Sequence, residues 1–198
     1  DAHAASIELD TAVTGVEPDG EDYLVHTEDG TERAETVVFT TPAPTTAALL
    51  EDVDPDAAET VSRFSYNPIG VVHLHSDFDG VGHGFHIIDE GFKTDGSTWN
   101  HSMLDREGVF TSYVGSGDAA FLDADPAVIG RRAAAEFETV TGAEATVLDA
   151  SVLRPGMPAY DRSWAALDEL SLPEGIEICA SFASRAGIVG RIAGGKRT

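Results

Sequence analysis

The stretch "DADPAVIGRRAAAEFETVTG" limits the possible folds more than any other part of the sequence. Asp125 suits a helix N-cap, Pro126 the first helical position, and Gly142 a left-handed helix end. The strand-like segments "GVFTSYVG" and "ATVLDASVLR" lie on either side of this helix in the sequence. This order predicts an α+β fold, in which helices pack on a mixed, mainly antiparallel sheet. The expected buried stripe of the helix is Ile129, Ala133, Phe137 and Val140.

More strands are expected on the N-terminal side of this helix. "IGVVHLH" and "GFHIID" read as strands, and "STWNHSM" and "GVFTSYVG" are expected to pair with them. Residues 5–41 read as a meander, in which "SIELDTAVTGVE" and "DYLVHT" are separated by turn signals. In "ETVVFTTPAP" successive residues are apolar, which predicts a strand buried on both faces as in a parallel sheet. A helix with Pro44 in its first turn should follow.

The C-terminal part of the chain has the pattern of a ligand contact. "SWAALDELSLPEG" reads as a helix and a turn, and "IEICAS" as a short buried strand. A small-residue loop and the helix start "GIVGRIAGG" come next. Glycines at such a junction let backbone groups approach a flat or anionic ligand, although glycine near a helix start also serves packing alone.

The charge balance excludes several classes of partner. The 198 residues include 35 Asp and Glu against 12 Lys and Arg, a formal net charge of −23. Such a surface opposes binding to nucleic acid or to an anionic membrane, and it is typical of proteins from a salt-rich cytoplasm. The sequence shows no signal peptide and no apolar run that could span a bilayer. Cys179, the single cysteine, lies between apolar residues and is expected to be a buried core thiol.

The order of these segments resembles the C-terminal half of the protoporphyrinogen oxidase family, within the flavin-containing amine oxidase superfamily. The resemblance covers nearly the whole chain, from "ETVVFTTPAP" through "FSYNPIGVVHLH" and "VLRPGMPAYDRSWAALDEL" to "LPEGIEICASFASRAGIVGRI". Its most specific part is "GMPAYDRSW". The resemblance implies FAD-domain segments at residues 1–44 and 173–198 around a substrate-binding domain at 45–172.

The resemblance also implies which residues contact FAD. The Val13 backbone would contact the adenine end, and Thr41 and Pro42 would lie near the flavin. Four C-terminal residues would lie along the isoalloxazine and the pyrophosphate: Ser181, Gly187, Ile188 and Val189. Arg185 would lie close to this flavin contact. The G-x-G-x-x-G phosphate loop of this family is absent from the sequence, so the main FAD-binding half would belong to a longer parent protein.

The same resemblance implies an oxidase of haem biosynthesis that passes hydride from protoporphyrinogen IX to flavin. Relatives oxidise amines or polyenes, so the substrate is a porphyrinogen-like molecule, an amine or a polyene. Met157, Pro158 and Tyr160 are expected to line the substrate cavity, and no catalytic acid or base is evident. Alone, this cytoplasmic chain is expected to hold FAD weakly and to be inactive.

Two alternatives to a flavoenzyme stay open at this point. The first is a divalent metal site in "HLHSDFDGVGHGFH". His73 and His75 would share one face of a strand, and a turn could return His83 or His86 to meet them. Together with Asp77, these side chains are an acceptable ligand set for zinc or another divalent ion. The other alternative is a non-catalytic interaction module. Such a module should present a polar surface where a fragment would expose an apolar patch.

Overall fold

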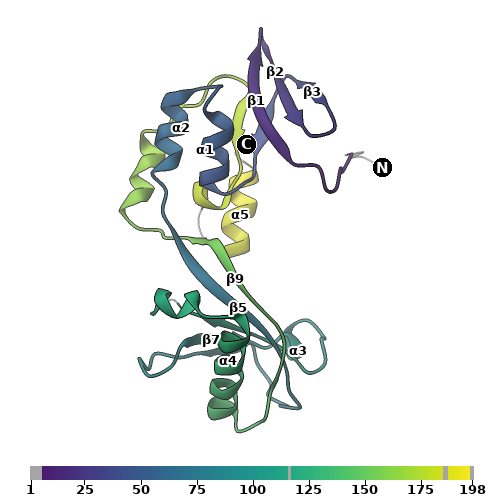
Figure 1. Ribbon diagram of the computed structural model, residues 1–198, viewed down its shortest axis with the longest axis vertical. Coiled ribbons are helices and arrows are strands. Elements are labelled where there is room, and N and C mark those ends of the chain that lie inside the picture. Colours follow the sequence, from purple (N-terminus) through teal and green to yellow (C-terminus); the bar gives the residue numbers. More distant parts are fainter. Residues whose placement is uncertain (1–5, 116, 185–186, 197–198) are drawn as a thin grey trace. The chain divides into compact units, whose positions relative to one another are not determined.

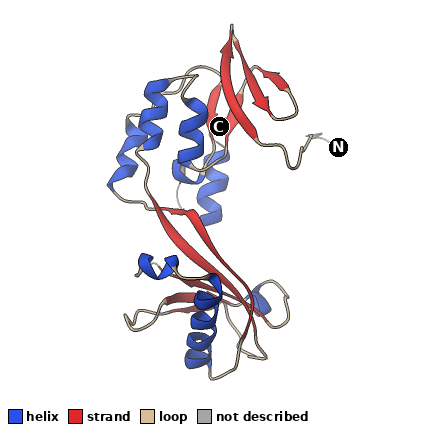
Figure 2. Cartoon of the chain, viewed as in Figure 1, coloured by secondary structure: helices blue, strands red, loops and turns tan. Residues whose placement is uncertain are grey.

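The chain divides into two compact units in the computed structural model, which describes residues 6–115, 117–184 and 187–196. Unit 1 comprises Asp1–Ser65 and Pro158–Thr198, and unit 2 comprises Tyr66–Met157. Figures 1 and 2 show the elements of each unit. The unit borders differ from the predicted segment borders, because residues 45–65 and 158–172 belong to unit 1.

Unit 1 contains the predicted N-terminal meander. Strands β1 (Val13–Asp19), β2 (Asp22–Thr27) and β3 (Thr31–Ala34) form a three-stranded sheet with antiparallel pairing. Gly20, between β1 and β2, has a φ of 73°, which glycine adopts at little cost in a tight turn. The turn signal in "PDGED" therefore lies where the sequence predicts it.

A second sheet in unit 1 joins distant parts of the sequence. Strand β4 (Val37–Phe39) pairs in parallel with β10 (Ile176–Ile178), which confirms the parallel strand predicted in "ETVVFTTPAP". The expected burial on both faces is wrong for the described chain, because Val38 is 47% exposed. The strand has its apolar pattern, but the described residues cover its second face only in part.

The helices of unit 1 follow proline signals. Helix α1 (Ala43–Leu50) has Pro44 in its first turn, as predicted, and α2 (Pro55–Ser62) follows. The sequence analysis missed α2, although the Asp54 side chain accepts a hydrogen bond from the Ala57 amide as an N-cap. The stretch expected as a helix after "GMPAYDR" forms the 3-10 helix η2 (Arg162–Asp168). The 3-10 helix η3 (Ser181–Ala183) and helix α5 (Gly187–Gly195) follow later in the chain.

Unit 2 is built on a five-stranded sheet in the order β6-β7-β8-β5-β9. The pairs β6–β7, β7–β8 and β5–β8 are antiparallel, so the α+β class with a mainly antiparallel sheet is confirmed. The prediction of a strand in "STWNHSM" is wrong for its second half, which forms the short helix α3 (Asn100–Met103). The strands are β5 (Tyr66–His75), β6 (Gly84–His86), β7 (Thr94–Thr98), β8 (Val109–Val114) and β9 (Thr146–Pro158).

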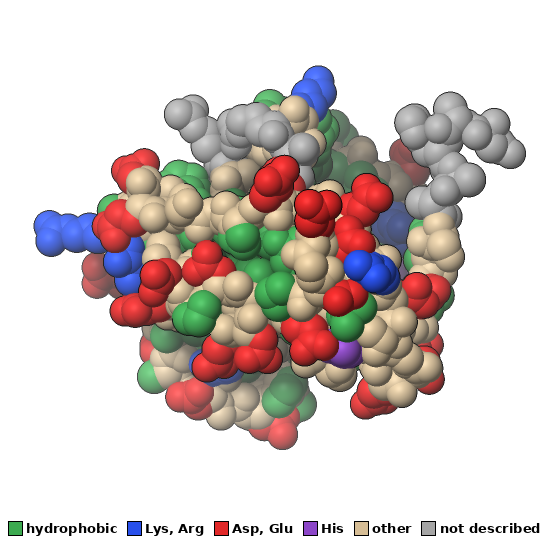
Figure 3. Space-filling view, turned by 90° about the horizontal axis from the view of Figure 1, so that it is seen from above, with side chains coloured by type: hydrophobic (Ala, Val, Ile, Leu, Met, Phe, Trp, Pro, Cys, Tyr) green, Lys and Arg blue, Asp and Glu red, His purple; other side chains and the backbone are tan. Residues whose placement is uncertain are grey.

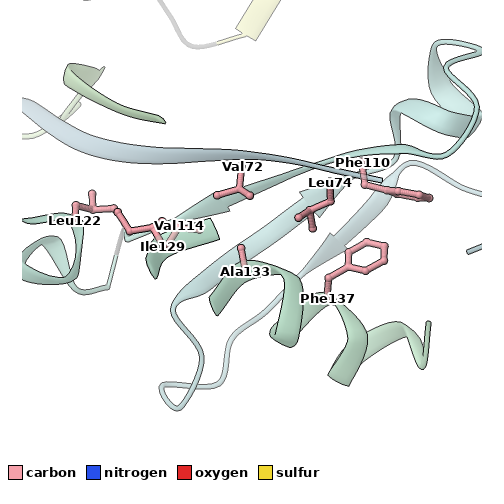
Figure 4. Packing of buried hydrophobic residues seen from close by; sticks show 8 residues of the cluster. All are labelled: Val72, Leu74, Phe110, Val114, Leu122, Ile129, Ala133 and Phe137. Carbon is pink, nitrogen blue, oxygen red and sulfur yellow. The ribbon is translucent and has the colours of Figure 1, made fainter. Parts of the chain in front are cut away.

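Helix α4 (Pro126–Thr141) covers one face of this sheet and forms the core with it (Figure 4). Its predicted boundaries are confirmed, with Asp125 as N-cap and Gly142 in the left-handed conformation at φ 76°. Val140 is wrong as a core residue, because it is 44% exposed and does not belong to the core cluster. The 3-10 helix η1 (Ala119–Asp123) adds Leu122 to this core. The core cluster consists of Val72, Leu74, Phe110, Val114, Leu122, Ile129, Ala133 and Phe137.

The acidic residues are spread over the surface and do not form one tail. Figure 3 shows Asp and Glu side chains distributed over one face, with few Lys and Arg among them. In the described part of the chain, no helix is both long enough and apolar enough to cross a lipid bilayer.

Candidate functional site

The parallel pair β4–β10 brings two predicted cofactor segments to one edge of a sheet. The strands pair in register from Val37 with Ile176 to Phe39 with Ile178, and the Cys179 amide donates to the Phe39 carbonyl at 2.9 Å. The segments after both strands therefore leave the sheet at the same carboxyl edge. Ligands of open parallel sheets bind at this edge.

Thr41 and Pro42 connect this edge to helix α1. The Thr41 and Thr46 hydroxyls lie 2.8 Å apart, and the Thr46 hydroxyl also donates to the Thr41 carbonyl at 3.2 Å. Thr46 is buried, so these bonds hold the turn between strand and helix in one conformation. Pro42 is the N-cap residue and is exposed.

Ser181, on the β10 side of the edge, is held by an arginine from α5. The Arg191 guanidinium donates to the Ser181 carbonyl, to the Ser184 carbonyl at 3.0 Å and to the Ser184 hydroxyl at 2.7 Å. It also donates to the Tyr160 hydroxyl at 2.8 Å. The sequence analysis missed Arg191, and its signal is a single cation among apolar residues and glycines in "GIVGRIAGG".

A cavity of about 240 Å³ lies beside this arginine in unit 1. Small side chains dominate its wall, so the backbone between β10 and η3 is accessible from it. Cys179 belongs to this wall and is half-buried, which corrects the expected core thiol. The lining residues are Glu177, Ile178, Cys179, Ala180, Ser181, Ala183, Ser184, Arg191 and Gly194.

The remaining predicted cofactor residues lie on α5 and β1. Ile188 and Val189 are 79% and 82% exposed, so the first turn of α5 presents an apolar surface. Gly187 begins this turn with a φ of 84°, and a side chain there would meet no atom within 4 Å. Val13 starts β1 in the other sheet of unit 1 and is not joined to this edge by strand pairing. Arg185 lies outside the described residues.

The predicted substrate residues lie where the chain returns from unit 2 to unit 1. Met157 is half exposed and ends unit 2, and Pro158 is buried in unit 1. The Tyr160 ring packs edge-on against Trp164 at 5.0 Å between centroids, and the Trp164 indole donates to the Phe182 carbonyl at 2.7 Å. Tyr160 is therefore part of the same hydrogen-bonded group of unit 1 as Arg191.

A comparison with models of protein families shows to which family the chain belongs. Residues 1–170 match the model of the family described as flavin containing amine oxidoreductase. The chain belongs to the flavin-containing amine oxidoreductase family. This family consists of oxidoreductases that use a flavin cofactor. A search of curated proteins found no match.

Solved structures show the same fold as this flavin amine oxidoreductase chain at low identity. One is a proposed protoporphyrinogen oxidase from Exiguobacterium sp. 255-15, with a TM-score of 0.73 and 18% identity. A CLA-producing fatty acid isomerase from P. acnes has a TM-score of 0.66 at 12% identity. A double mutant of putrescine oxidase, made to redesign cofactor binding, has a TM-score of 0.67 at 14% identity. The match covers 94% of this chain in each case, but only 45%, 46% and 47% of the three neighbours.

The histidines singled out in the sequence do not assemble. His73 and His75 do share one face of β5, because Val72 and Leu74 point to the core on the other. Among residues 6–115, 117–184 and 187–196, no group of three or more His, Cys, Asp or Glu side chains could hold a metal ion. The predicted return of His83 or His86 to this pair is not found. His73 is instead bonded to Thr111, with 3.0 Å between Nδ1 and Oγ1.

Proposed function

We propose that this chain supplies part of the flavin edge and the substrate domain of an FAD-dependent oxidoreductase. The observation that carries the proposal is the β4–β10 pair, which places Thr41, Pro42 and Ser181 at one carboxyl edge in a member of a flavin-containing family. The segments 1–44 and 173–198 then serve FAD, and 45–172 serves the substrate.

The residues at this edge suit a flat, partly apolar cofactor. The cavity wall after β10 carries the small side chains of Ala180, Ser181, Ala183 and Ser184. Gly187 leaves open space in front of its backbone. Ile188 and Val189 offer apolar contact surface on the next turn. An independent interaction module would present a polar surface here, so the exposed apolar residues support the flavoenzyme proposal.

The reaction we propose is the oxidation of a CH–CH or CH–NH group. The flavin, when bound, accepts the hydride, and the chain orients the substrate and keeps water away from it. Protoporphyrinogen IX is the first candidate substrate, in agreement with the name of the Exiguobacterium neighbour. An amine is the second, because a net charge of −23 raises the local concentration of cations. A polyene is a third.

Met157, Pro158 and Tyr160 are the residues that we propose to line the substrate cavity. In the flavin-loaded enzyme, Met157→Ala and Tyr160→Phe should raise KM, because each removes contact surface or a hydroxyl. Steady-state kinetics with each candidate substrate measures this change. Unchanged turnover and KM in both variants would remove these residues from the substrate site.

Flavin binding tests the proposed function directly. The gene region upstream of the Asp1 codon should encode, in frame, a strand followed by G-x-G-x-x-G. We expect the product with this region to purify with bound FAD, visible in its absorption spectrum, while residues 1–198 alone lose FAD on gel filtration. The proposal is wrong if the longer product binds no flavin.

A further inference from the structure

The sheet of unit 2 has a polar face opposite the core. Along β5, Gly70, Val72 and Leu74 are buried on the side of α4, so Val71, His73 and His75 point to the other side. In the register of the sheet, His73 lies directly opposite Thr111 of β8, and Thr111 opposite Thr98 of β7. Three polar side chains therefore form a row across three neighbouring strands.

Hydrogen bonds order this row. Asn100, just after β7, donates from Nδ2 to the Thr111 hydroxyl at 2.8 Å. The Thr111 hydroxyl lies 3.0 Å from Nδ1 of His73. Thr111 is only 5% exposed, so its hydroxyl proton must be used within the protein, because a buried unpaired donor is unfavourable. The Thr98 hydroxyl adds a long bond of 3.4 Å to the Asn100 amide oxygen.

These contacts assign a tautomer to His73. Since Asn100 already donates to Thr111, the Thr111 hydroxyl donates in turn to Nδ1 of His73. The neutral ring then carries its proton on Nε2. Within the described part of the chain, Nε2 has no hydrogen-bond partner, and the ring is half-buried on the polar face.

We propose that His73 is a substrate-positioning residue, whose Nε2–H donates a hydrogen bond to an acceptor group of the substrate. Asn100 and Thr111 fix the ring and its tautomer, in the way that a catalytic base is oriented by its neighbours. This inference rests on the proposed function, since it places His73 on the substrate domain of the flavoenzyme.

The direction of this hydrogen bond distinguishes the candidate substrates. A fixed donor matches a carboxylate, such as a propionate group of a porphyrinogen, but it opposes a protonated amine, which is also a donor. A site built for one hydrogen-bonding pattern rejects a ligand with the wrong one. His73 thus favours a carboxylate-bearing substrate, although the net charge alone favours an amine. The charge acts at long range and is screened by salt, while this bond acts at contact.

The tautomer can be measured without flavin or activity. In residues 1–198 labelled with ¹⁵N-histidine, the His73 ring should show the Nε2–H form when neutral. Thr111→Val keeps the side-chain shape and should lower the share of the Nε2–H form toward that of a free histidine ring, while Thr98→Val should leave the share unchanged. An Nδ1–H ring in the unmodified chain, or no change in Thr111→Val, would overturn the inference.

Binding to the flavin-loaded protein tests the role itself. Mesoporphyrin IX, which carries two propionates, and putrescine serve as the two probes. His73→Phe should weaken porphyrin binding about 10-fold to 100-fold, as expected for loss of a hydrogen bond to a charged group, and leave putrescine binding unchanged. His73→Gln keeps a donor near Nε2 and should bind porphyrin within about threefold of the unmodified protein.

His75→Gln is the matched control, because His75 lies on the same face two residues further along and is exposed. Unchanged porphyrin binding in His73→Phe, or an equal loss in His75→Gln, would overturn the positioning role while flavin binding stands. Absence of flavin from the longer product would instead overturn the proposed function, and the ¹⁵N measurement would still decide the tautomer.

Discussion

Glu136 shows how one buried side chain connects two elements. It lies on α4, and its carboxylate accepts hydrogen bonds from the Lys93 amide at 2.9 Å and the Thr94 amide at 2.8 Å, at the start of β7. Arg132, one turn earlier, donates to the same carboxylate. Burial raises the pKa of Glu136, but the hydrogen bonds from Thr94, Lys93 and Arg132 outweigh it and hold the pKa below its usual value. The carboxylate therefore stays ionised and holds the first residues of the strand against the helix.

Glu136→Gln should lower the free energy of unfolding by about 1–3 kcal/mol at pH 7, because the Lys93 and Thr94 amides donate to different carboxylate oxygens and a Gln amide has only one oxygen to accept them. A carboxylate with a lowered folded pKa stabilises the fold above its unfolded pKa of about 4.3, and this stabilisation is lost as the pH falls through the folded value. Urea denaturation should thus show a constant gap between the two proteins from pH 6 to pH 8, with the gap closing in acid. Equal stabilities at pH 7 would contradict the role of Glu136.

At the scale of elements, α5 is attached by hydrogen bonds and not by apolar burial. None of its described residues is buried. Arg191 alone reaches Ser181, Ser184 and Tyr160, and so ties α5 to η3 and to the segment before η2. A planar guanidinium spreads five N–H donors over a rigid fork and so reaches acceptors on different segments, whereas a lysine has three donors at a single nitrogen.

Arg191→Lys should loosen α5 while the rest of unit 1 keeps its structure. Hydrogen exchange at the amides of Gly187–Gly195 should become roughly tenfold faster or more, since two or more bonds of about 1 kcal/mol each are lost. Arg131→Lys, on the exposed side of α4, is the matched control and should not change exchange in α5. An unchanged α5 in Arg191→Lys would show that other contacts hold the helix.

For the whole molecule, the net charge of −23 dominates the electrostatics. The described ion pairs are few for this excess of acid, and most involve exposed arginines, such as Arg33 with Asp19 and Asp22. Exposed pairs of this kind stabilise little, so repulsion between carboxylates opposes the compact state at low ionic strength.

Added KCl should therefore raise the Tm, most steeply below about 0.3 M, where the screening length changes most. Thermal unfolding followed by circular dichroism at neutral pH gives this curve. Sucrose, which stabilises without screening, should give no such steep initial rise. A Tm that falls or stays level with KCl would argue against the predicted adaptation to a salt-rich cytoplasm.

Much of the fold could be predicted because its signals are local. Asp125, Pro126 and Gly142 define α4 through bonds within a few residues, and the Gly20 turn is also local. The same logic would have found α2 from Asp54 and Pro55. The predicted burial of Val38 and Val140 is wrong, because burial depends on which distant part of the chain covers a residue. A short sequence pattern does not contain that information.

The sequence by itself determined the class of fold, the Gly20 turn, the caps of α4 and the flavin-containing superfamily, since each depends on residue order and on contacts between near neighbours. Only the tertiary structure decided that Arg191 meets Ser181 and Tyr160, and that Asn100 and Thr111 orient His73. These groups come from segments up to 38 residues apart in the sequence. Their hydrogen bonds depend on strand register and helix placement, which are settled when the whole unit packs.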